Sequence, residues 1–378
     1  MRVTIASETL FPQVNGVSRC LDRLVRHLSE RGDTVQLIGP RYSEEWEGDP
    51  AGVVRAEFRA VPVPFYREIL LPVARNARVR RCLTGFGPQV VHVATEGPLG
   101  WQVLRAARRL ALPVVSSYHT NFSQYMRYYH LGLIEPPLWR YLRWFHNRGS
   151  VTFCPTPSIR ELIESKGFEN VRVWSRGVDC GTFNPGFADP AVREQYGIES
   201  GEIALLYAGR LASEKNLAVL VEAMNALNAS RRVKLLLVGD GPFRGHLEQM
   251  ADERVVFTGY KHGRELSALY ASADVFVFPS LTDTFGNVLL EAMASGVPAV
   301  GFDAPGPRDV IRDGETGCVV RERSAEALAN ALGTLVGSPA RIRALGTAAR
   351  TYAEGQTWER INETVREGYA EVIACERA

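Results

Sequence analysis

Several common signatures are missing from this chain. No apolar stretch reaches the roughly 20 residues that a bilayer-spanning helix needs. The six cysteines are scattered and form no C-x-x-C pair, so we expect reduced thiols, neither disulfides nor zinc ligands. H-E-x-x-H, Asp-x-Asp and Asp-rich metal loops are absent, which predicts a protein without a metal site or other cofactor. No cleavage site follows the apolar start, and we therefore expect a cytoplasmic location.

The compact G-x-G-x-x-G loop of dinucleotide-binding enzymes is also absent. The turn after the first expected strand runs from Ser7 to Val17 instead, which argues against a nicotinamide enzyme. Within it, Asn15-Gly16 would let the backbone approach a phosphate closely before the next helix. The same pair is equally typical of an ordinary turn.

Length and charge set the next bounds. A chain of 378 residues is long for one core, so we expect two domains. The net charge of +2 hides an asymmetry: residues 1–180 hold 24 basic and 16 acidic side chains, and residues 181–378 hold 20 and 26. A basic half beside an acidic half suggests an anionic partner, and nucleic acid, acidic lipid and a phosphorylated substrate all remain possible.

Strand-like and helical runs alternate through both halves of the chain, which predicts an α/β fold with parallel sheets. We expect strands at Val3–Ser7, Thr34–Ile38, Val90–Val93, Val114–Tyr118, Val151–Pro155, Ala204–Ala208, Lys234–Val238, Val255–Thr258, Val275–Pro279 and Ala299–Phe302. The boundary is expected in Arg176–Pro190, which gives two doubly wound Rossmann-like domains, residues 1–180 and 181–356, facing each other across a cleft. Residues 357–378 form a last helix that could pack on either domain.

The segment Leu281–Gly296 is the most informative part of the sequence. Asp283 and Glu291 are eight residues apart, and a helix that begins near Gly286 would place them about 12 Å apart at ~1.5 Å per residue. The free N–H groups of the first turn of that helix would suit an anion, with Asp283 just ahead of them and Glu291 further along. The spacing therefore fits a ligand with an anionic middle and hydroxyls at both ends, such as a nucleotide sugar.

Two cations follow the expected strand Ala204–Ala208. Arg210 could grip one phosphate with two hydrogen bonds, and Lys215 would add a point charge, although this spacing is also common in solvated surface pairs. Tyr260 and Lys261 stand at another strand end, where the backbone could contact a base.

His119 ends a strand in the first half and is followed by an aromatic, arginine-rich run from Phe122 to Arg148. An earlier run, Phe65–Arg81, is similar in character. A mixed basic and apolar surface suits peripheral contact with a membrane. Alternatively, the aromatic residues are core and the arginines ordinary surface charge; stacking on nucleic acid bases is the weaker third interpretation.

Together these residues resemble the retaining nucleotide-sugar glycosyltransferases of family 4, which have the GT-B fold. The resemblance rests on Asn15-Gly16, His119, Arg210 with Lys215, and T-D-T-F-G-N-V-L-L-E-A-M-A-S-G, which contains Asp283 and Glu291. The segments V-N-G-V, H-V-A-T-E-G-P-L-G and S-Y-H-T-N-F resemble the branch of GDP-mannose-dependent α-mannosyltransferases and glycolipid glycosyltransferases.

The resemblance implies a role for each matching position. Arg210 and Lys215 would hold the donor diphosphate, Glu291 the ribose, and Asp283, where the family usually has glutamate, the transferred sugar. Backbone groups of Phe285, Gly286, Asn287 and Val288 would help to hold sugar and phosphate. Gly16 would approach the phosphates, and His119 would reach the sugar near the reacting carbon. The last helix would cross back to the first domain.

The leading hypothesis is therefore a retaining, metal-independent hexosyltransferase that moves mannose from GDP-mannose to a lipid or glycan acceptor at the inner membrane face. The alternatives are a UDP-sugar-dependent transferase of the same fold, a nucleotide-sugar epimerase, and a non-catalytic lipid- or nucleic-acid-binding protein. We expect no nucleic acid partner.

Overall fold

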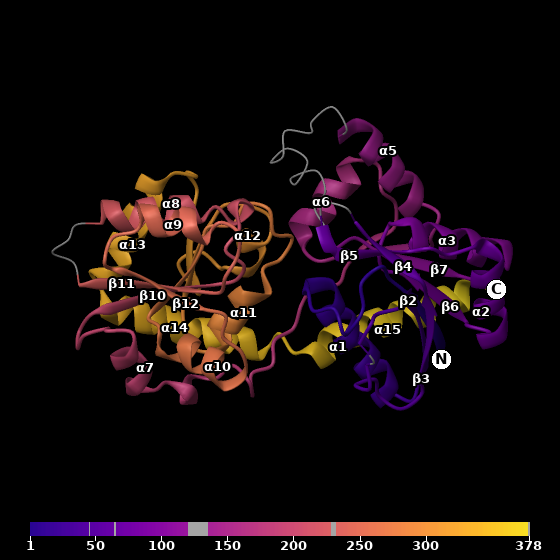
Figure 1. Cartoon of the computed structure of the whole chain (residues 1–378), viewed down its shortest axis with the longest axis horizontal. Coiled ribbons are helices and arrows are strands. Elements are labelled where there is room, and N and C mark those ends of the chain that lie inside the picture. The colour runs from indigo at the N-terminus through magenta and orange to yellow at the C-terminus, as the bar shows by residue number, and fades with distance from the viewer. Residues whose placement is uncertain (45, 64–65, 120–134, 228–231, 377–378) are drawn as a thin grey trace. The chain divides into compact units, whose positions relative to one another are not determined.

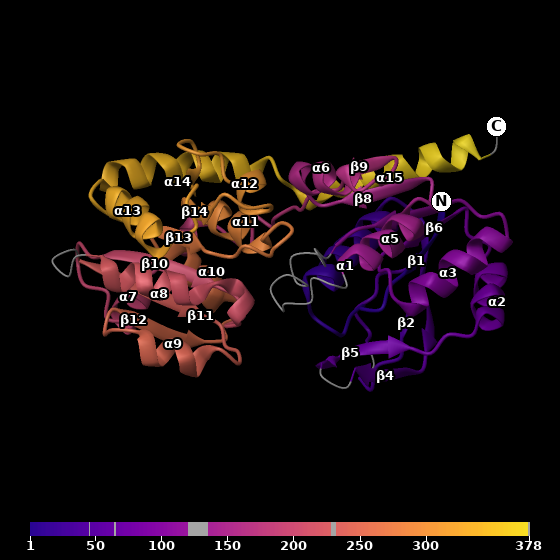
Figure 2. The ribbon, with the colours of Figure 1, turned by 90° about the horizontal axis from the view of Figure 1, so that it is seen from above.

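The computed structural model describes residues 1–44, 46–63, 66–119, 135–227 and 232–376 of the chain. The chain divides into two compact units, Met1–Arg176 with Trp358–Ala378, and Gly177–Thr357. Figures 1 and 2 show the elements of each unit.

The first unit is built on a seven-stranded parallel sheet with the order β3-β2-β1-β6-β7-β8-β9. Its strands are β1 (Arg2–Ala6), β2 (Thr34–Pro40), β3 (Val53–Phe58), β6 (Val90–Val93), β7 (Val114–Ser117), β8 (Val151–Cys154) and β9 (Val171–Val173). The helices described here are α1 (Gly16–Glu30), α2 (Asn76–Phe86), α3 (Pro98–Arg109), α5 (Glu135–His146), α6 (Pro157–Ser165) and α15 (Trp358–Cys375). The pair β4 (Ala60–Val63) and β5 (Tyr66–Pro72) is a separate antiparallel sheet.

The second unit repeats this scheme with a six-stranded parallel sheet of order β12-β11-β10-β13-β14-β15. Its strands are β10 (Ile203–Ala208), β11 (Val233–Val238), β12 (Val255–Gly259), β13 (Val275–Phe278), β14 (Ala299–Phe302) and β15 (Gly317–Val320). Its helices are α7 (Pro190–Gln195), α8 (Leu217–Ala226), α9 (Arg244–Met250), α10 (Gly263–Ser272), α11 (Asn287–Ala294), α12 (Pro307–Val310), α13 (Ala325–Val336) and α14 (Pro339–Glu354), with 3-10 turns η2 (Pro185–Phe187) and η3 (Ser213–Lys215).

Both sheets reverse their strand order once, and these reversals determine where a ligand can bind. In the first sheet the chain runs outward from β1 to β3 and resumes with β6 on the other side of β1; in the second, β11 and β12 lie on one side of β10 and β13 on the other. Ligands of open parallel sheets bind outside the carboxyl ends of the strands at such points. The loops after β1 and β6, and after β10 and β13, are therefore the places to search for a site.

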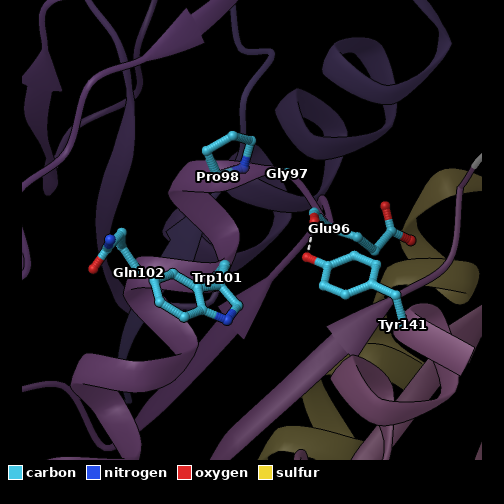
Figure 3. Close-up of a pocket in the computed structure, with 6 residues that line it drawn as sticks. All are labelled: Glu96, Gly97, Pro98, Trp101, Gln102 and Tyr141. Atoms are coloured by element: carbon cyan, nitrogen blue, oxygen red, sulfur yellow. Dashed lines mark hydrogen bonds between the residues drawn. The ribbon is translucent and has the colours of Figure 1, made fainter. Parts of the chain in front are cut away.

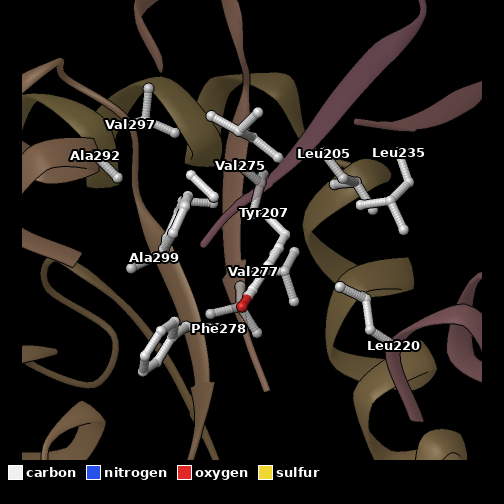
Figure 4. Packing of buried hydrophobic residues seen from close by; sticks show 14 of the residues in the cluster. Leu205, Tyr207, Leu220, Leu235, Val275, Val277, Phe278, Ala292, Val297 and Ala299 are labelled. Carbon is white, nitrogen blue, oxygen red and sulfur yellow. The ribbon is translucent and has the colours of Figure 1, made fainter. Parts of the chain in front are cut away.

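Helix coverage of both faces explains why the central strands read as continuous apolar runs. Each residue of β13 and β14 is buried. Figure 4 shows side chains of the second core, among them Tyr207 of β10, Val277 of β13 and Leu220 of α8. The sequence did not suggest the antiparallel pair β4 and β5 or the edge strands β3, β9 and β15. These three edge strands are only partly buried, which weakens their apolar pattern.

The last helix packs within the first unit. On α15, Val365, Tyr369, Val372 and Ile373 join the apolar cluster that includes Leu21 and Leu24 of α1. His27 of α1 and Glu363 of α15 are also 2.9 Å apart. An apolar stripe on α15 therefore completes the first core, although α15 follows the second unit in the sequence.

Candidate functional site

The loops after β10 and β13 bring Lys215 and Asp283 together. Lys215 Nζ donates to both carboxylate oxygens of Asp283 at 2.8 Å, and the two side chains are 18% and 22% exposed. Lys215 ends η3, and Asp283 lies five residues beyond β13. The sequence proposed both residues for one ligand but did not suggest that they pair with each other.

Arg210 lies two residues after β10 and remains substantially exposed. Its guanidinium donates to Oε1 of the buried Glu214 at 3.4 Å, and its side chain is 44% exposed. A long, partly exposed contact of this kind holds the side chain only weakly. Arg210 thus keeps most of its donor groups at the solvent edge of the site.

Helix α11 begins where the sequence predicted, with Gly286 as its N-cap. Gly286 has a φ of 82°, and a Cβ there would lie 2.9 Å from the Phe278 ring, so glycine is needed on both counts. Asn287 and Val288 form the first helical positions, and Phe285 is buried against the core. On the same helix, Glu291 Oε2 accepts a hydrogen bond of 2.9 Å from the Tyr270 hydroxyl of α10. Tyr270 therefore orients Glu291, a role that the sequence did not indicate.

Tyr260 and Lys261 lie farther along the same edge of the sheet. The Tyr260 hydroxyl donates to the Asp240 carbonyl at 3.1 Å, and its side chain is exposed. Lys261 Nζ lies 3.6 Å from Glu265 Oε1. Tyr260 thus contacts the loop after β11, and Lys261 contacts α10. In the sheet, β11 lies next to β10, the strand that Arg210 follows.

Asn15 caps the first helix of the first unit. Its Oδ1 accepts hydrogen bonds from the backbone N–H groups of Val17 and Ser18 at 3.0 Å. A Cβ on Gly16 would meet no atom within 4 Å, so packing of the chain itself does not require glycine there. The Asn15-Gly16 turn is thus an ordinary helix cap with open space beside it.

His119 follows β7 and is almost completely buried, at 8% exposure. Its Nε2 lies 2.8 Å from Ser117 Oγ, and its Nδ1 accepts a hydrogen bond of 3.0 Å from Arg176. Burial first, and then the positive charge of Arg176, hold the pKa of His119 well below its usual value. Thr120 to Ile134, which include the first part of the aromatic run, lie outside the described residues, as do Pro64 and Phe65.

A second polar cluster follows β1 and β6 and was missed by the sequence reasoning. The buried Glu8 carboxylate accepts hydrogen bonds from Gly100 N at 3.0 Å and from the Thr95 hydroxyl. Desolvation, opposed by the Gly100 hydrogen bond and reinforced by the charge of Glu96, raises the pKa of Glu8 to about 7. Glu96 in turn bonds His146 at 3.1 Å. The sequence did contain a signal for this cluster, because Glu8 and Glu96 follow the central strands β1 and β6 within three residues.

A hollow of about 600 Å³ lies beside this cluster, at the start of α3 (Figure 3). Trp101 and Tyr141 line it, and the Tyr141 hydroxyl donates to the Glu96 carbonyl at 2.5 Å. Glu96, Gly97, Pro98 and Gln102 complete the lining. An aromatic surface next to hydrogen-bonding groups suits a ligand with both apolar and hydroxyl parts.

In the described ranges, no group of three or more His, Cys, Asp or Glu side chains could hold a metal ion. The helices of the same ranges are too short or too polar for any of them to cross a bilayer.

Comparison with known proteins connects both units to one enzyme class. Residues 14–182 match the family model Glycosyltransferase Family 4, and residues 202–338 match the model Glycosyl transferases group 1. A GDP-mannose-dependent alpha-mannosyltransferase of Mycobacterium tuberculosis is 35% identical over 95% of this chain and 93% of its own length. An alpha-monoglucosyldiacylglycerol synthase of Streptococcus pneumoniae is 29% identical over 83% and 74%.

A solved structure supports the fold. A sucrose-phosphate synthase from Thermosynechococcus elongatus superimposes with a TM-score of 0.82 over 99% of both chains, at 20% identity. At this identity the likeness bears on the fold alone, and it confirms the predicted GT-B class of two parallel-sheet Rossmann-like domains.

Proposed function

The chain belongs to the family-4 glycosyltransferases, and from this premise we propose that it moves mannose from GDP-mannose to a lipid or glycolipid acceptor, with retention at the sugar carbon. That it is a hexosyltransferase follows from the family and the named relatives. The epimerase alternative is not supported, because the relatives named above are transferases or synthases. The observation that carries the proposal is the Arg210, Lys215 and Asp283 group at the strand reversal of the second sheet.

We assign the donor diphosphate to Arg210 and Lys215. Lys215 already bonds an anionic group, the Asp283 carboxylate, with both oxygens at 2.8 Å. On binding, the diphosphate would replace the Asp283 carboxylate as the partner of Lys215, and Asp283 could then contact the sugar hydroxyls. The N-terminal turn of α11 would add backbone N–H groups from Asn287 and Val288. Glu291, oriented by Tyr270, would bond the ribose.

Charge stabilisation explains how such a site would accelerate transfer. As the sugar leaves, positive charge builds on its ring and negative charge on the diphosphate. Cations placed in advance beside the leaving group lower the barrier because they bind the transition state more tightly than the ground state. In this proposal Arg210 and Lys215 serve in place of a metal, and the diphosphate takes the acceptor's proton on the face from which it departs.

We place the acceptor beside Trp101 and Tyr141. This hollow adjoins the loop after β6, at the strand reversal of the first sheet. The name of the pneumococcal relative, which forms a monoglucosyldiacylglycerol, favours a lipid acceptor. In the same unit, Asn15-Gly16 has open space beside it and would let the backbone approach a phosphate closely.

We further propose that arginines on α2, α3 and α5 meet an anionic membrane at the cytoplasmic face. Exposed arginines on these helices include Arg78, Arg80, Arg81, Arg105, Arg108, Arg109 and Arg140. Arg148 stacks on the exposed Trp144 ring at 4.0 Å, and burial together with the charge of Arg108 lowers the pKa of Arg148. A basic surface with an aromatic residue is what interfacial binding requires.

A donor screen tests the central proposal. The purified protein is incubated with GDP-mannose, GDP-glucose, UDP-glucose and UDP-galactose, with and without lipid extract, and the products are identified by mass. We expect GDP-mannose turnover that rises with lipid extract. Turnover of UDP-sugars alone would refute the donor assignment.

A further inference from the structure

A chain of buried hydrogen bonds in the first unit ends on His119. The Tyr369 hydroxyl of α15 lies 2.6 Å from His92 Nδ1, and His92 Nε2 lies 2.9 Å from Ser117 Oγ. Ser117 Oγ then bonds His119 Nε2 at 2.8 Å. Tyr369 and His92 are fully buried, and burial lowers the pKa of His92 to about 3. One ring nitrogen of His119 is therefore held by a rigid, uncharged chain of side chains.

Arg176 holds the other ring nitrogen. Its guanidinium donates to His119 Nδ1 at 3.0 Å and to the carbonyl oxygens of Trp174 and Ser175 at 2.7 and 3.1 Å. It also lies over the Trp174 ring, 5.2 Å from the centroid, and the residue is only 5% exposed. Among the described residues, no carboxylate forms an ion pair with it. A buried guanidinium without an acidic partner is costly, so its placement against an imidazole calls for a reason.

The donor chemistry of arginine determines the protonation of His119. A guanidinium has only donors, so the Nδ1 atom that accepts from Arg176 carries no proton. A neutral imidazole then carries its proton on Nε2, directed at Ser117 Oγ. Protonation of Nδ1 would break the Arg176 contact and place two positive charges side by side.

We propose that Arg176 is a positioning residue for sugar transfer, which holds His119 as a neutral ring with its proton on Nε2 and its plane fixed. This proposal rests on the proposed sugar transfer and on the role near the reacting carbon that the family resemblance implies for His119. Positive charge builds on the sugar in the transition state, and a cationic imidazole beside it would oppose that charge. Arg176 would therefore extend activity to lower pH.

The chain passes from one unit to the other twice, and each connecting segment adjoins an element of this hydrogen-bond network. Arg176 is the last residue of the first unit before the chain leaves it, and Tyr369 lies on the helix that follows the return. The titratable and charged groups around the His119 ring come from several elements: His92 of β6, His146 of α5, Arg176 after β9 and, through Arg176, Cys20 of α1 and Cys154 of β8. Of these groups, Arg176 both contacts the His119 ring directly and carries a permanent positive charge.

The test compares Arg176→Met and Arg176→Lys with Arg254→Met. Arg254 is a matched control because it also donates to two backbone carbonyls, of Met224 and Leu227, and lies in the second unit. We expect kcat of the wild-type protein to stay nearly constant from pH 8 to pH 5.5. In Arg176→Met, kcat should fall by about twofold or more over that range, because loss of the Arg176 charge raises the pKa of His119 while burial still lowers it. Arg176→Lys keeps a cationic donor and should retain most of the wild-type profile.

A spectroscopic measurement on the wild-type protein needs no substrate and does not depend on the Arg176 variants. In wild-type protein labelled with ¹⁵N-histidine, two-bond proton–nitrogen spectra should show the His119 ring neutral at pH 7 with its proton on Nε2; His119→Gln assigns the signal. A cationic ring, or a proton on Nδ1, would refute the proposal even if Arg176→Met does not fold. Normal wild-type turnover with an unshifted acid limb in Arg176→Met also refutes it. Absence of turnover in every protein refutes the proposed function instead.

Discussion

Lys215 and Asp283 show how two residues can each fit a functional motif and still neutralise each other. Their bidentate contact is partly exposed, so solvent screening limits what it adds to stability. We therefore propose that the contact does little for stability and that a bound anion can replace Asp283 as the partner of Lys215. Arg210, held only by a long contact to Glu214, completes the cationic side of the proposed site.

Replacement of Arg210 by alanine is the sharpest test of the donor assignment. We expect kcat to fall by about 10²–10³-fold, because one preorganised cation beside the leaving diphosphate is lost. The thermal unfolding midpoint should hardly change, since the side chain is 44% exposed. Arg232→Ala removes an exposed arginine paired with Glu199 and serves as the control. Near-normal turnover in Arg210→Ala would end the proposed role.

The raised pKa of Glu8 predicts that the free energy of unfolding depends on pH. Its pKa is raised to about 7 in the folded protein, so the folded state binds a proton that the unfolded chain releases near 4.5. The stabilisation from this proton is complete below about pH 4.5 and is lost as pH rises through 7. Glu8→Gln keeps a neutral side chain, so its unfolding free energy should exceed that of the wild type increasingly from pH 5 to pH 8, by up to ~3 kcal/mol.

Urea unfolding of both proteins at several pH values measures this difference. A gap between Glu8→Gln and wild type that does not widen with pH would contradict the raised pKa. Glu376→Gln, near the exposed end of the chain, is the control and should show no such trend.

At the scale of elements, the loops that follow central strands hold the residues proposed for binding and catalysis. Helix α3 begins directly after Glu96 and Gly97, and a Cβ on Gly97 would lie 2.5 Å from Glu8 Oε1, so this turn needs glycine. The same turn places Trp101 in the hollow beside Tyr141. The turn between β6 and α3 thus places the buried Glu8 carboxyl group close to the aromatic surface formed by Trp101 and Tyr141.

Trp101→Ala tests whether the start of α3 binds the acceptor. We expect transfer to lipid extract to fall by at least about tenfold, since an aromatic contact surface is lost. Hydrolysis of the donor without acceptor should stay within about twofold of the wild type, because Arg210, Lys215 and Glu291, which are proposed to hold the donor nucleotide, lie in the other unit. Equal loss of both activities would contradict an acceptor role.

At the scale of the whole molecule, charge is unevenly divided, and this division predicts behaviour at membranes. Residues 1–180 carry 24 basic and 16 acidic side chains. At low salt we expect the protein to sediment with vesicles containing phosphatidylglycerol but not with phosphatidylcholine vesicles, and 0.5 M salt should reverse the binding because it screens the charges. Substitution of Arg105, Arg108 and Arg109 by glutamine should weaken it. Equal binding to both vesicle types would refute an electrostatic contact.

The sequence by itself determined the fold class, the family and most of the strand-end motifs. Strands buried on both faces appear directly as apolar runs, and a loop after such a strand must lie at the ligand-binding edge of its sheet. The edge strands β3, β9 and β15 and the separate β4–β5 pair escaped this reasoning; partial exposure dilutes the apolar pattern of β3 and β9.

The tertiary structure alone decided which functional side chains meet. Lys215 and Asp283 are 68 residues apart, His119 and Arg176 are 57 apart, and His92 and Tyr369 are 277 apart. Local pattern cannot encode such contacts, because they depend on which strands become neighbours and on where α15 packs. The sequence thus indicated the sheet edges at which the candidate site residues lie, and packing determined the partner of each charged group.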